Sequence, residues 1–151
     1  LFIAGGSAGG IATAYAVGLT DRFNAAVAAK PVINWISKTL TADSMVGQIY
    51  HQFPGPPWEN LEHYWERSPL SLVGNVTTPT MLLTGEEDRR TPISETEQFY
   101  QALRLQGVES AMVRLPDTSH GIADRPSRLI AKVDHILAWF ERYRTDKDQG
   151  N

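Results

Sequence analysis

The chain opens with LFIAGGSAGGIATAYAV, residues 1–17, which predicts a β-strand, a tight turn and an α-helix in that order. Gly5 and Gly9 are expected to let the strand and the helix pack closely around one strained residue, Ser7, whose hydroxyl is then exposed. The N–H of the following residue, Ala8, lies at the positive end of the helix. We therefore take Ser7 as a candidate nucleophile and the Ala8 N–H as a candidate oxyanion donor.

Glycine-rich turns also bind phosphate groups, or simply cap a helix with a serine. A phosphate-binding P-loop ends in Lys-Ser or Lys-Thr, and this run does not. A dinucleotide site is expected to carry an acidic residue about 20 positions further on. Asp21 comes earlier than that, and no neighbouring strand places it. A serine-capped turn without catalytic function remains the alternative.

Further strands and helices alternate along the chain, which is typical of an α/β fold with a mostly parallel sheet. The continuous apolar run at residues 25–29 predicts a strand that is covered on both faces. Residues 80–84 predict another buried strand, and residues 111–115 are the next strand candidate. Between the first two of these, residues 34–68 are irregular and aromatic, and we expect helices and loops there. No internal repeat or low-complexity segment interrupts the pattern.

Two helices follow the later strands. The capping-box spacing of residues 94–97 predicts the start of a helix that Gly107 ends. After Pro126, apolar positions recur on one face of another helix. They are Leu129, Val133, Ile136, Leu137 and Phe140.

A serine nucleophile needs a base and an orienting acid, which in hydrolases of this fold follow it in the order serine, acid, histidine. Asp88 comes directly after the strand at 80–84, and His120 comes after the strand at 111–115. Because parallel strands end at the same edge of a sheet, both side chains are expected near Ser7. His120 would take the proton of Ser7, and Asp88 would orient the imidazole.

Both assignments have competitors. Glu86 and Glu87 lie in the same loop as Asp88, so either could be the acid. Three other histidines are present, of which one lies in the last helix and two in the irregular segment: His51, His63 and His135. Only His120 follows a predicted strand, which favours it as the base.

These motifs resemble the catalytic domain of the prolyl oligopeptidase family, most closely its acylaminoacyl-peptidase and bacterial dipeptidyl-aminopeptidase-like branch. The resemblance rests on GGSAGG at residues 5–10, LTGEEDRRTP at 83–92 and SHG at 119–121. AAKPVINW at 28–35 and YWERSP at 64–69 add to it. It covers nearly the whole chain, to about residue 143, although Ala8 stands where relatives often have tyrosine or histidine.

The resemblance implies the C-terminal portion of an α/β-hydrolase fold, with a mostly parallel sheet flanked by helices. It implies Ser7, Asp88 and His120 as the catalytic triad. Arg90 matches an arginine that binds a substrate carbonyl in several members, a role suited to a guanidinium. The aromatic segment falls where the family builds part of its substrate pocket, and Trp35 is the candidate wall of that pocket.

Composition limits the possible partners. The 151 residues have a net charge of −3, so the composition does not indicate a positively charged surface for nucleic acid. They contain no cysteine, which excludes disulfides and thiolate metal sites. No apolar run is long enough to predict a membrane span. We expect a short peptide substrate, no cofactor and no metal, and we leave the compartment and the formation of homo-oligomers open.

The leading hypothesis is a serine peptidase that releases an acylated or free N-terminal residue or dipeptide. The alternatives are a carboxylesterase with the same triad and a non-catalytic binding module. Because the first strand begins at once and Leu1 is not methionine, we expect residues 1–151 to be part of a catalytic domain, with earlier strands and a β-propeller upstream. The second oxyanion donor would lie upstream too, so the 151 residues alone are expected to be inactive.

Overall fold

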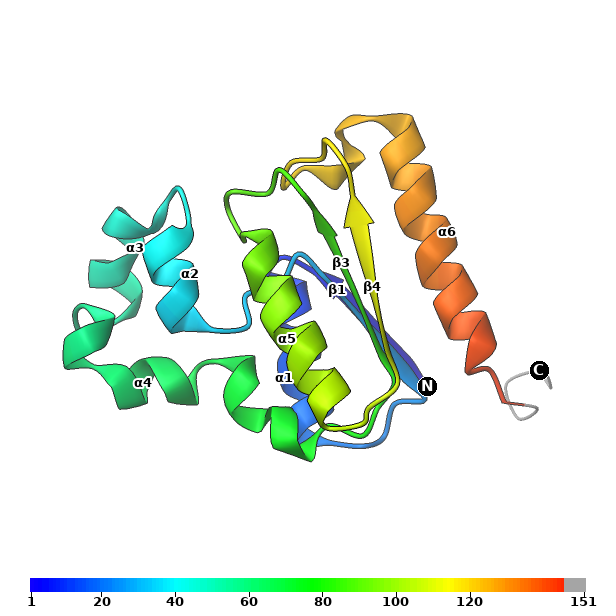
Figure 1. Cartoon of the computed structure of the whole chain (residues 1–151), viewed down its shortest axis with the longest axis horizontal. Helices are drawn as coiled ribbons and strands as arrows, with labels where there is room; N and C mark the ends of the chain where they lie inside the picture. The colour runs from blue at the N-terminus through cyan, green and yellow to red at the C-terminus, as the bar shows by residue number, and fades with distance from the viewer. Residues whose placement is uncertain (146–151) are drawn as a thin grey trace.

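The computed structural model describes residues 1–145, including every side chain in that range except those of residues 45, 46 and 48. Its sheet has the order β1-β2-β3-β4, and each strand is parallel to its neighbour. The bounds are β1 Phe2–Gly6, β2 Ala25–Ala29, β3 Thr80–Gly85 and β4 Ser110–Leu115. Chain order and spatial order therefore coincide, and the parallel strands all end at the same edge of the sheet, toward which the arrows of β3 and β4 point in Figure 1.

Helices cover both faces of this sheet. On one face lie α1 (Ala8–Leu19) and α5 (Ile93–Leu105), and on the other lies α6 (Pro126–Arg142) (Figure 1). Residues of β2 alternate between the two layers: Ala26 and Ala28 belong to the core under α1 and α5, and Val27 packs with Trp139 of α6. All five residues of β2 are buried, as an apolar run in a sheet covered on both faces requires.

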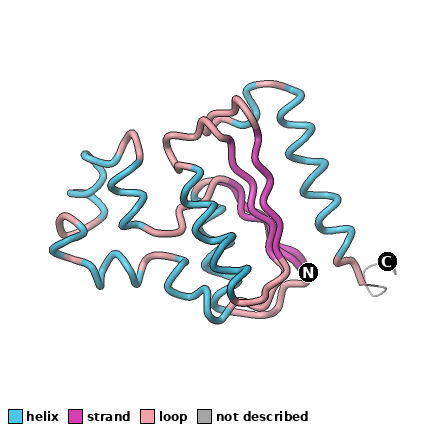
Figure 2. The backbone as a smooth tube through the Cα atoms, viewed as in Figure 1, coloured by secondary structure: helices cyan, strands magenta, loops and turns pink. Residues whose placement is uncertain are grey.

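Between β2 and β3 the chain makes a helical excursion beside the sheet (Figure 2). It contains α2 (Trp35–Thr41), α3 (Met45–Gln52) and α4 (Leu61–Glu66), with 3-10 turns at Pro57–Glu59 and Pro69–Asn75. Phe53 and Tyr64 stack with their ring centroids 4.0 Å apart, and the Tyr64 hydroxyl donates to the Gly55 carbonyl at 2.9 Å. The expected mixture of helices and loops is confirmed, with aromatic stacking as its core.

The predicted capping box at the start of α5 is wrong. The helix begins at Ile93, its N-cap residue is Pro92, and no side chain caps it. Glu95 is instead fully buried and bonds to the start of α2, while Glu97 pairs with Arg114 of β4 at 2.7 Å. Tertiary partners therefore use the carboxylates of the first two turns, although the predicted end of the helix at Gly107, with a φ of 72°, is confirmed.

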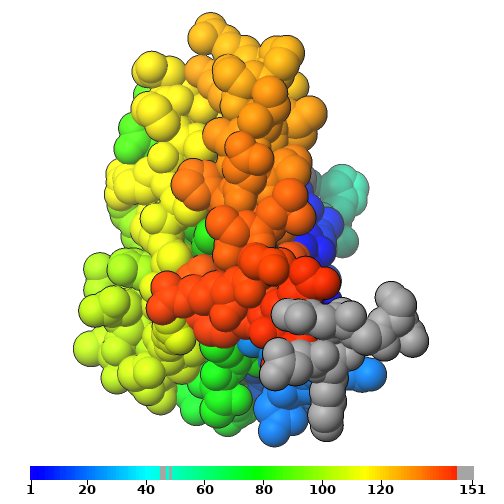
Figure 3. All heavy atoms as spheres, turned by 90° about the vertical axis from the view of Figure 1, so that its right-hand side faces the viewer, coloured from blue at the N-terminus to red at the C-terminus, as the bar shows by residue number. Residues whose placement is uncertain are grey.

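The apolar stripe of α6 only partly faces the sheet. Phe140 stacks on Phe2 at 4.7 Å, and the buried Trp139 packs against β2 and β3. Much of the rest of the stripe is open, because Leu129 and Val133 are each 42% exposed and Leu137 is 61% exposed. Figure 3 shows α6 running down this side of the molecule.

Candidate active site

Ser7 occupies the sharp turn between β1 and α1. Its φ of 57° and ψ of −116° put a non-glycine residue in a strained conformation, which persists only where the surroundings enforce it. They do so through two hydrogen bonds, because the Ser7 N–H donates to Ala29 O and its carbonyl accepts from Ile11 N, both at 3.0 Å. Ala8 begins α1, so its N–H has no acceptor within the helix.

Two glycines make this turn possible by allowing close backbone contact. A Cβ on Gly5 would lie 2.1 Å from Gly9 O, and a Cβ on Gly10 would lie 2.5 Å from Ala29 O. A Cβ on Gly9 would meet no atom within 4 Å. The expected packing role is therefore confirmed for Gly5 and wrong for Gly9, which supplies only the backbone that Gly5 contacts. The second glycine needed for packing is Gly10.

The structure brings Ser7, His120 and Asp88 into one hydrogen-bonded row. Ser7 Oγ lies 3.0 Å from His120 Nε2, and His120 Nδ1 lies 2.7 Å from Asp88 Oδ2. Asp88 follows β3 and His120 follows β4, so both loops lie at the upper edge of the sheet (Figure 1). A serine, an imidazole and a carboxylate in this order can pass a proton from the hydroxyl to a ring whose charged form is stabilised.

The acid of this row is fully enclosed. The Asp88 side chain is 0% exposed, and its Oδ1 accepts from the N–H groups of Arg90 at 2.9 Å and Thr91 at 2.8 Å. The alternative acids point elsewhere, because Glu86 pairs with Arg114 at 3.1 Å and Glu87 is exposed. Of the three carboxylates in this loop, only that of Asp88 contacts the imidazole.

The histidine loop is held by close backbone packing and by a lysine. A Cβ on Gly85 would lie 2.0 Å from Thr118 O, so only glycine fits beside this loop. Lys30, which follows β2 with a φ of 42°, donates from Nζ to His120 O at 2.6 Å. Burial lowers the pKa of Lys30 and nearby Lys132 lowers it further, whereas Asp88 and Asp124 act in the opposite direction. This role of Lys30 was not predicted from the sequence, where the only local signal is a positively charged residue directly after a buried strand.

The other three histidines lie away from this row, on α3, α4 and α6. They are His51, His63 and His135. His63 lies edge-on to Phe53 within the aromatic core of the excursion, 5.9 Å between centroids. Of the four histidines, all of which lie in the described part of the chain, only His120 hydrogen-bonds Ser7 and Asp88 through its ring.

The two candidate substrate-binding side chains both contact residues of the excursion. Arg90 Nε pairs with Asp43 Oδ1 at 3.0 Å, and both side chains are largely exposed. Trp35 packs on Phe53 with 5.4 Å between centroids, and Lys38 Nζ lies 5.7 Å above the indole. Neither the guanidinium of Arg90 nor the indole hydrogen-bonds the Ser7–His120–Asp88 row in the described part of the chain. Their substrate-binding roles therefore stay predictions.

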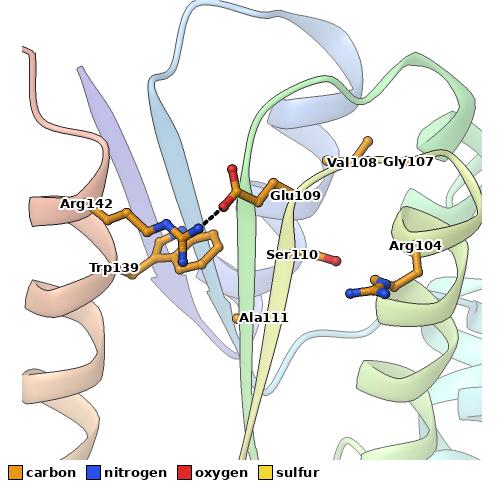
Figure 4. A pocket seen from close by; sticks show the side chains of 8 residues that line it. All are labelled: Arg104, Gly107, Val108, Glu109, Ser110, Ala111, Trp139 and Arg142. Carbon is orange, nitrogen blue, oxygen red and sulfur yellow. Dashed lines mark hydrogen bonds and ion pairs between the residues drawn. The ribbon is translucent and has the colours of Figure 1, made fainter.

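A hollow of about 490 Å³ opens at the opposite end of β4 from His120 (Figure 4). It is lined by Arg104, Gly107, Val108, Glu109, Ser110, Ala111, Trp139 and Arg142. Glu109 pairs with Arg142 there. Because Ser110 begins the strand and His120 follows its end, this hollow takes no part in the site around Ser7.

Within residues 1–145, no group of three or more histidine or acidic side chains is arranged to hold a metal ion. The same residues contain no helix long and apolar enough to cross a membrane.

Known proteins resemble this chain over most of its length. A peptidase of unassigned function from Bacillus subtilis, YuxL, is 38% identical over 147 residues, which cover 95% of this chain and 22% of that protein. The acylamino-acid-releasing enzyme of Arabidopsis thaliana is 34% identical over 149 residues, covering 93% and 19% respectively. The chain thus spans about a fifth of the length of these relatives.

Solved structures that resemble this chain are also peptidases. The acylaminoacyl peptidase of Pyrococcus horikoshii superposes with a TM-score of 0.88 at 27% identity, over 94% of this chain and 23% of that one. A puromycin-hydrolyzing peptidase of Mycobacterium tuberculosis gives 0.85 at 29% identity, over 95% and 22%. The expected α/β-hydrolase fold is therefore confirmed. The model of the prolyl oligopeptidase family matches residues 1–147, and this chain belongs to that family.

Proposed function

We propose that this chain carries the nucleophile, acid and base of a serine peptidase that hydrolyses short peptides. The observation that carries the proposal is the row from Ser7 Oγ to His120 Nε2 at 3.0 Å and from His120 Nδ1 to the buried Asp88 at 2.7 Å. Membership in a peptidase family supports the same reaction.

In the proposed reaction, Ser7 Oγ bonds to the substrate carbonyl carbon while His120 Nε2 takes the hydroxyl proton. The oxyanion accepts a hydrogen bond from the Ala8 N–H, which the first turn of α1 leaves without a helical partner. His120 then gives its proton to the leaving amine as the C–N bond breaks. Water then attacks the carbonyl carbon of the acyl-enzyme while His120 takes one of its protons. The bond to Ser7 Oγ breaks, the carboxylic acid product leaves, and His120 returns the proton to Ser7.

The proposed substrates are peptides from which an acylated or free N-terminal residue or dipeptide is released. Relatives at 34% and 28% identity are named acylamino-acid-releasing enzyme and dipeptidyl-peptidase 5. Arg90 is proposed to bind a peptide carbonyl once it leaves Asp43, and both side chains are exposed enough for this exchange. Trp35 is proposed to form part of the pocket wall.

We further propose that residues 1–151 are part of a catalytic domain that continues upstream, where a β-propeller would precede it. Within the described residues β1 pairs with β2 alone, so its other edge is open. Beside it, Phe2, Leu137 and Phe140 line an open hollow, and the stripe of α6 is partly exposed. An unpaired edge next to exposed apolar side chains is unfavourable in an isolated domain. The 151 residues expressed alone are therefore expected to show no turnover.

The test uses the full-length protein with a fluorophosphonate probe and three substrates: an acetyl-amino-acid anilide, a dipeptide anilide and a simple aryl ester. Ser7→Ala should abolish labelling and lower anilide turnover by about 10⁴-fold or more. Ser127→Ala, an exposed serine of α6, is the matched control and should change neither. Ester turnover without any anilide turnover would establish a carboxylesterase instead, and absence of labelling at Ser7 would establish a non-catalytic module.

A further inference from the structure

The hydroxyl of Thr91 lies against both partners of the proposed proton relay. Its Oγ1 is 3.0 Å from Asp88 Oδ2, 3.2 Å from His120 Nδ1 and 3.2 Å from Lys30 O. Thr91 is only 4% exposed, so water does not compete freely for these contacts. One buried hydroxyl thus touches the acid, the base and the turn after β2.

The single proton of this hydroxyl can serve only one acceptor at a time. When His120 Nε2 accepts from Ser7, its Nδ1 carries a proton, which it donates to Asp88 at 2.7 Å. Nδ1 then cannot accept from Thr91. The carboxylate is the preferred acceptor, because it is charged and lies closer than Lys30 O.

This donation completes the hydrogen bonding of Asp88. A carboxylate has about four acceptor sites, and here Oδ1 takes two backbone N–H groups while Oδ2 takes the imidazole and the hydroxyl. Thr91 supplies two of the four donors, one from its backbone and one from its side chain. Without the hydroxyl, Oδ2 of a carboxylate that is 0% exposed would keep the imidazole as its sole donor.

We propose that Thr91 is a positioning residue whose hydroxyl fixes the orientation of the Asp88 carboxylate and so aligns the His120 ring that accepts the Ser7 proton. The inference rests on the proposed peptidase function. Removing the hydroxyl leaves Asp88 a stronger acceptor for the imidazole proton. The protonated form of His120 then becomes more stable, and the ring needs a higher pH to act as a base.

Other charges around the pair come from four elements. Lys30 reaches His120 O from the turn after β2, Asp124 lies on the 3-10 turn Ile122–Asp124, and Lys132 lies on α6. Arg90 contributes its backbone N–H, and its guanidinium is paired with Asp43. Substitutions at Thr91 leave all of these charges in place, so a change in pH dependence reports on the hydroxyl.

The experiment compares Thr91→Val, Thr91→Ala and Thr91→Ser in the full-length protein by the pH dependence of kcat/KM for a peptide anilide. Valine keeps the shape of threonine and loses the hydroxyl, and alanine serves if the valine variant does not fold. Both should lower kcat/KM by roughly tenfold, mainly through kcat, from the net worth of one hydrogen bond to a charged group. Both should also move the acidic limb of the profile to higher pH. Serine keeps the hydroxyl and should retain the profile of the unsubstituted protein.

A valine or alanine variant with an unmoved acidic limb overturns the inference, and so does a serine variant that behaves like valine. A second measurement separates this inference from the function itself. Selective ¹⁵N-histidine NMR follows the protonation of His120 whether or not the protein hydrolyses peptides. Absence of Ser7-dependent turnover refutes the peptidase, whereas an equal His120 titration in the valine and unsubstituted proteins refutes the role of Thr91.

Discussion

Glu95 connects the start of the helical excursion to α5, the helix that follows the loop with Asp88. Its Oε1 accepts from Ile33 N at 3.1 Å and Asn34 N at 2.9 Å, and its Oε2 accepts from Ser37 Oγ at 2.5 Å and Gln98 Nε2 at 3.0 Å. The side chain is fully buried. Replacing it with alanine therefore tests how strongly this carboxylate holds the segment that leads into α2.

The expected cost of Glu95→Ala follows from the groups that lose their acceptor. The N–H groups of Ile33 and Asn34 would both be left without a partner, at about 1–3 kcal/mol each. Water that enters the vacated space can accept from these N–H groups and recover part of this free energy. We therefore expect a cost near the lower end of the sum for the two groups, about 2–3 kcal/mol. At 1.4 kcal/mol per factor of ten, the segment should open about 30 to 150 times more often.

Hydrogen exchange measured by mass spectrometry on peptides covering residues 30–37 of the full-length protein detects this opening directly. Glu95→Gln is the isosteric variant, since its amide oxygen can still accept from both N–H groups, and we expect less than a tenfold change. Glu97→Ala removes an exposed carboxylate from the same helix and should leave this segment unchanged. Protection of residues 33 and 34 that stays the same in Glu95→Ala would refute the reasoning.

The same contact has a defined pH dependence. Burial raises the pKa of Glu95, and this outweighs the lowering by hydrogen bonds from Ser37, Asn34, Ile33 and Gln98. A carboxyl whose folded-state pKa is raised contributes stability that is fully present below its unfolded pKa, about 4.3, and is lost as the pH rises through the folded value. After correction for intrinsic exchange rates, Glu95→Gln should therefore gain protection relative to the unsubstituted protein as the pH rises from about 4 to neutrality. A constant ratio of the two protections over this range would contradict the raised pKa.

Three further predictions concern the geometry around Ser7. Gly5→Ala should abolish fluorophosphonate labelling, because its Cβ would lie 2.1 Å from a backbone oxygen, whereas Gly9→Ala should keep it, since nothing lies within 4 Å. Lys30→Met should lower kcat by about tenfold at an unchanged KM, because the charge-assisted bond to the histidine carbonyl is lost; an unaltered kcat contradicts this. Asp43→Asn should change the free energy of unfolding by less than about 1 kcal/mol, because exposed ion pairs contribute little. It should also lower the KM for peptides, because it frees Arg90 to bind them, and an unchanged KM argues against that binding role.

Local patterns in the sequence predicted most of the fold. The apolar run at residues 25–29 gives the bounds of β2 without error. A strand that is buried on both faces is apolar along its whole length, so its ends are easy to locate in the sequence. The turn around Ser7 was equally predictable, since its glycines are adjacent in the chain. The positions of Asp88 and His120 followed from a topological rule, that polar residues after parallel strands meet at one edge of the sheet.

Contacts between distant segments were not predictable in this way. Residues 94–97 have the spacing of a capping box, but the acceptors and donors that decide their roles are 61 and 62 positions away for Glu95. The periodicity of α6 likewise showed that one face is apolar, but not which neighbour covers each part of it. At Glu95, hydrogen bonds to distant residues and not local helix capping determine the role of the side chain.

Residues at the end of β2 contact all three loops that carry the proposed triad, because β2 lies between β1 and β3 in the sheet. Ala29 O accepts from the strained Ser7, the Thr91 hydroxyl lies 3.2 Å from Lys30 O, and Lys30 Nζ donates to His120 O. Each of the three loops that carry the proposed triad therefore contacts either Ala29 or Lys30. A positive φ at Lys30 is unfavourable for a non-glycine residue, and these bonds explain why it persists. Small displacements of this turn would move all three side chains together, so its substitutions should couple energetically rather than add.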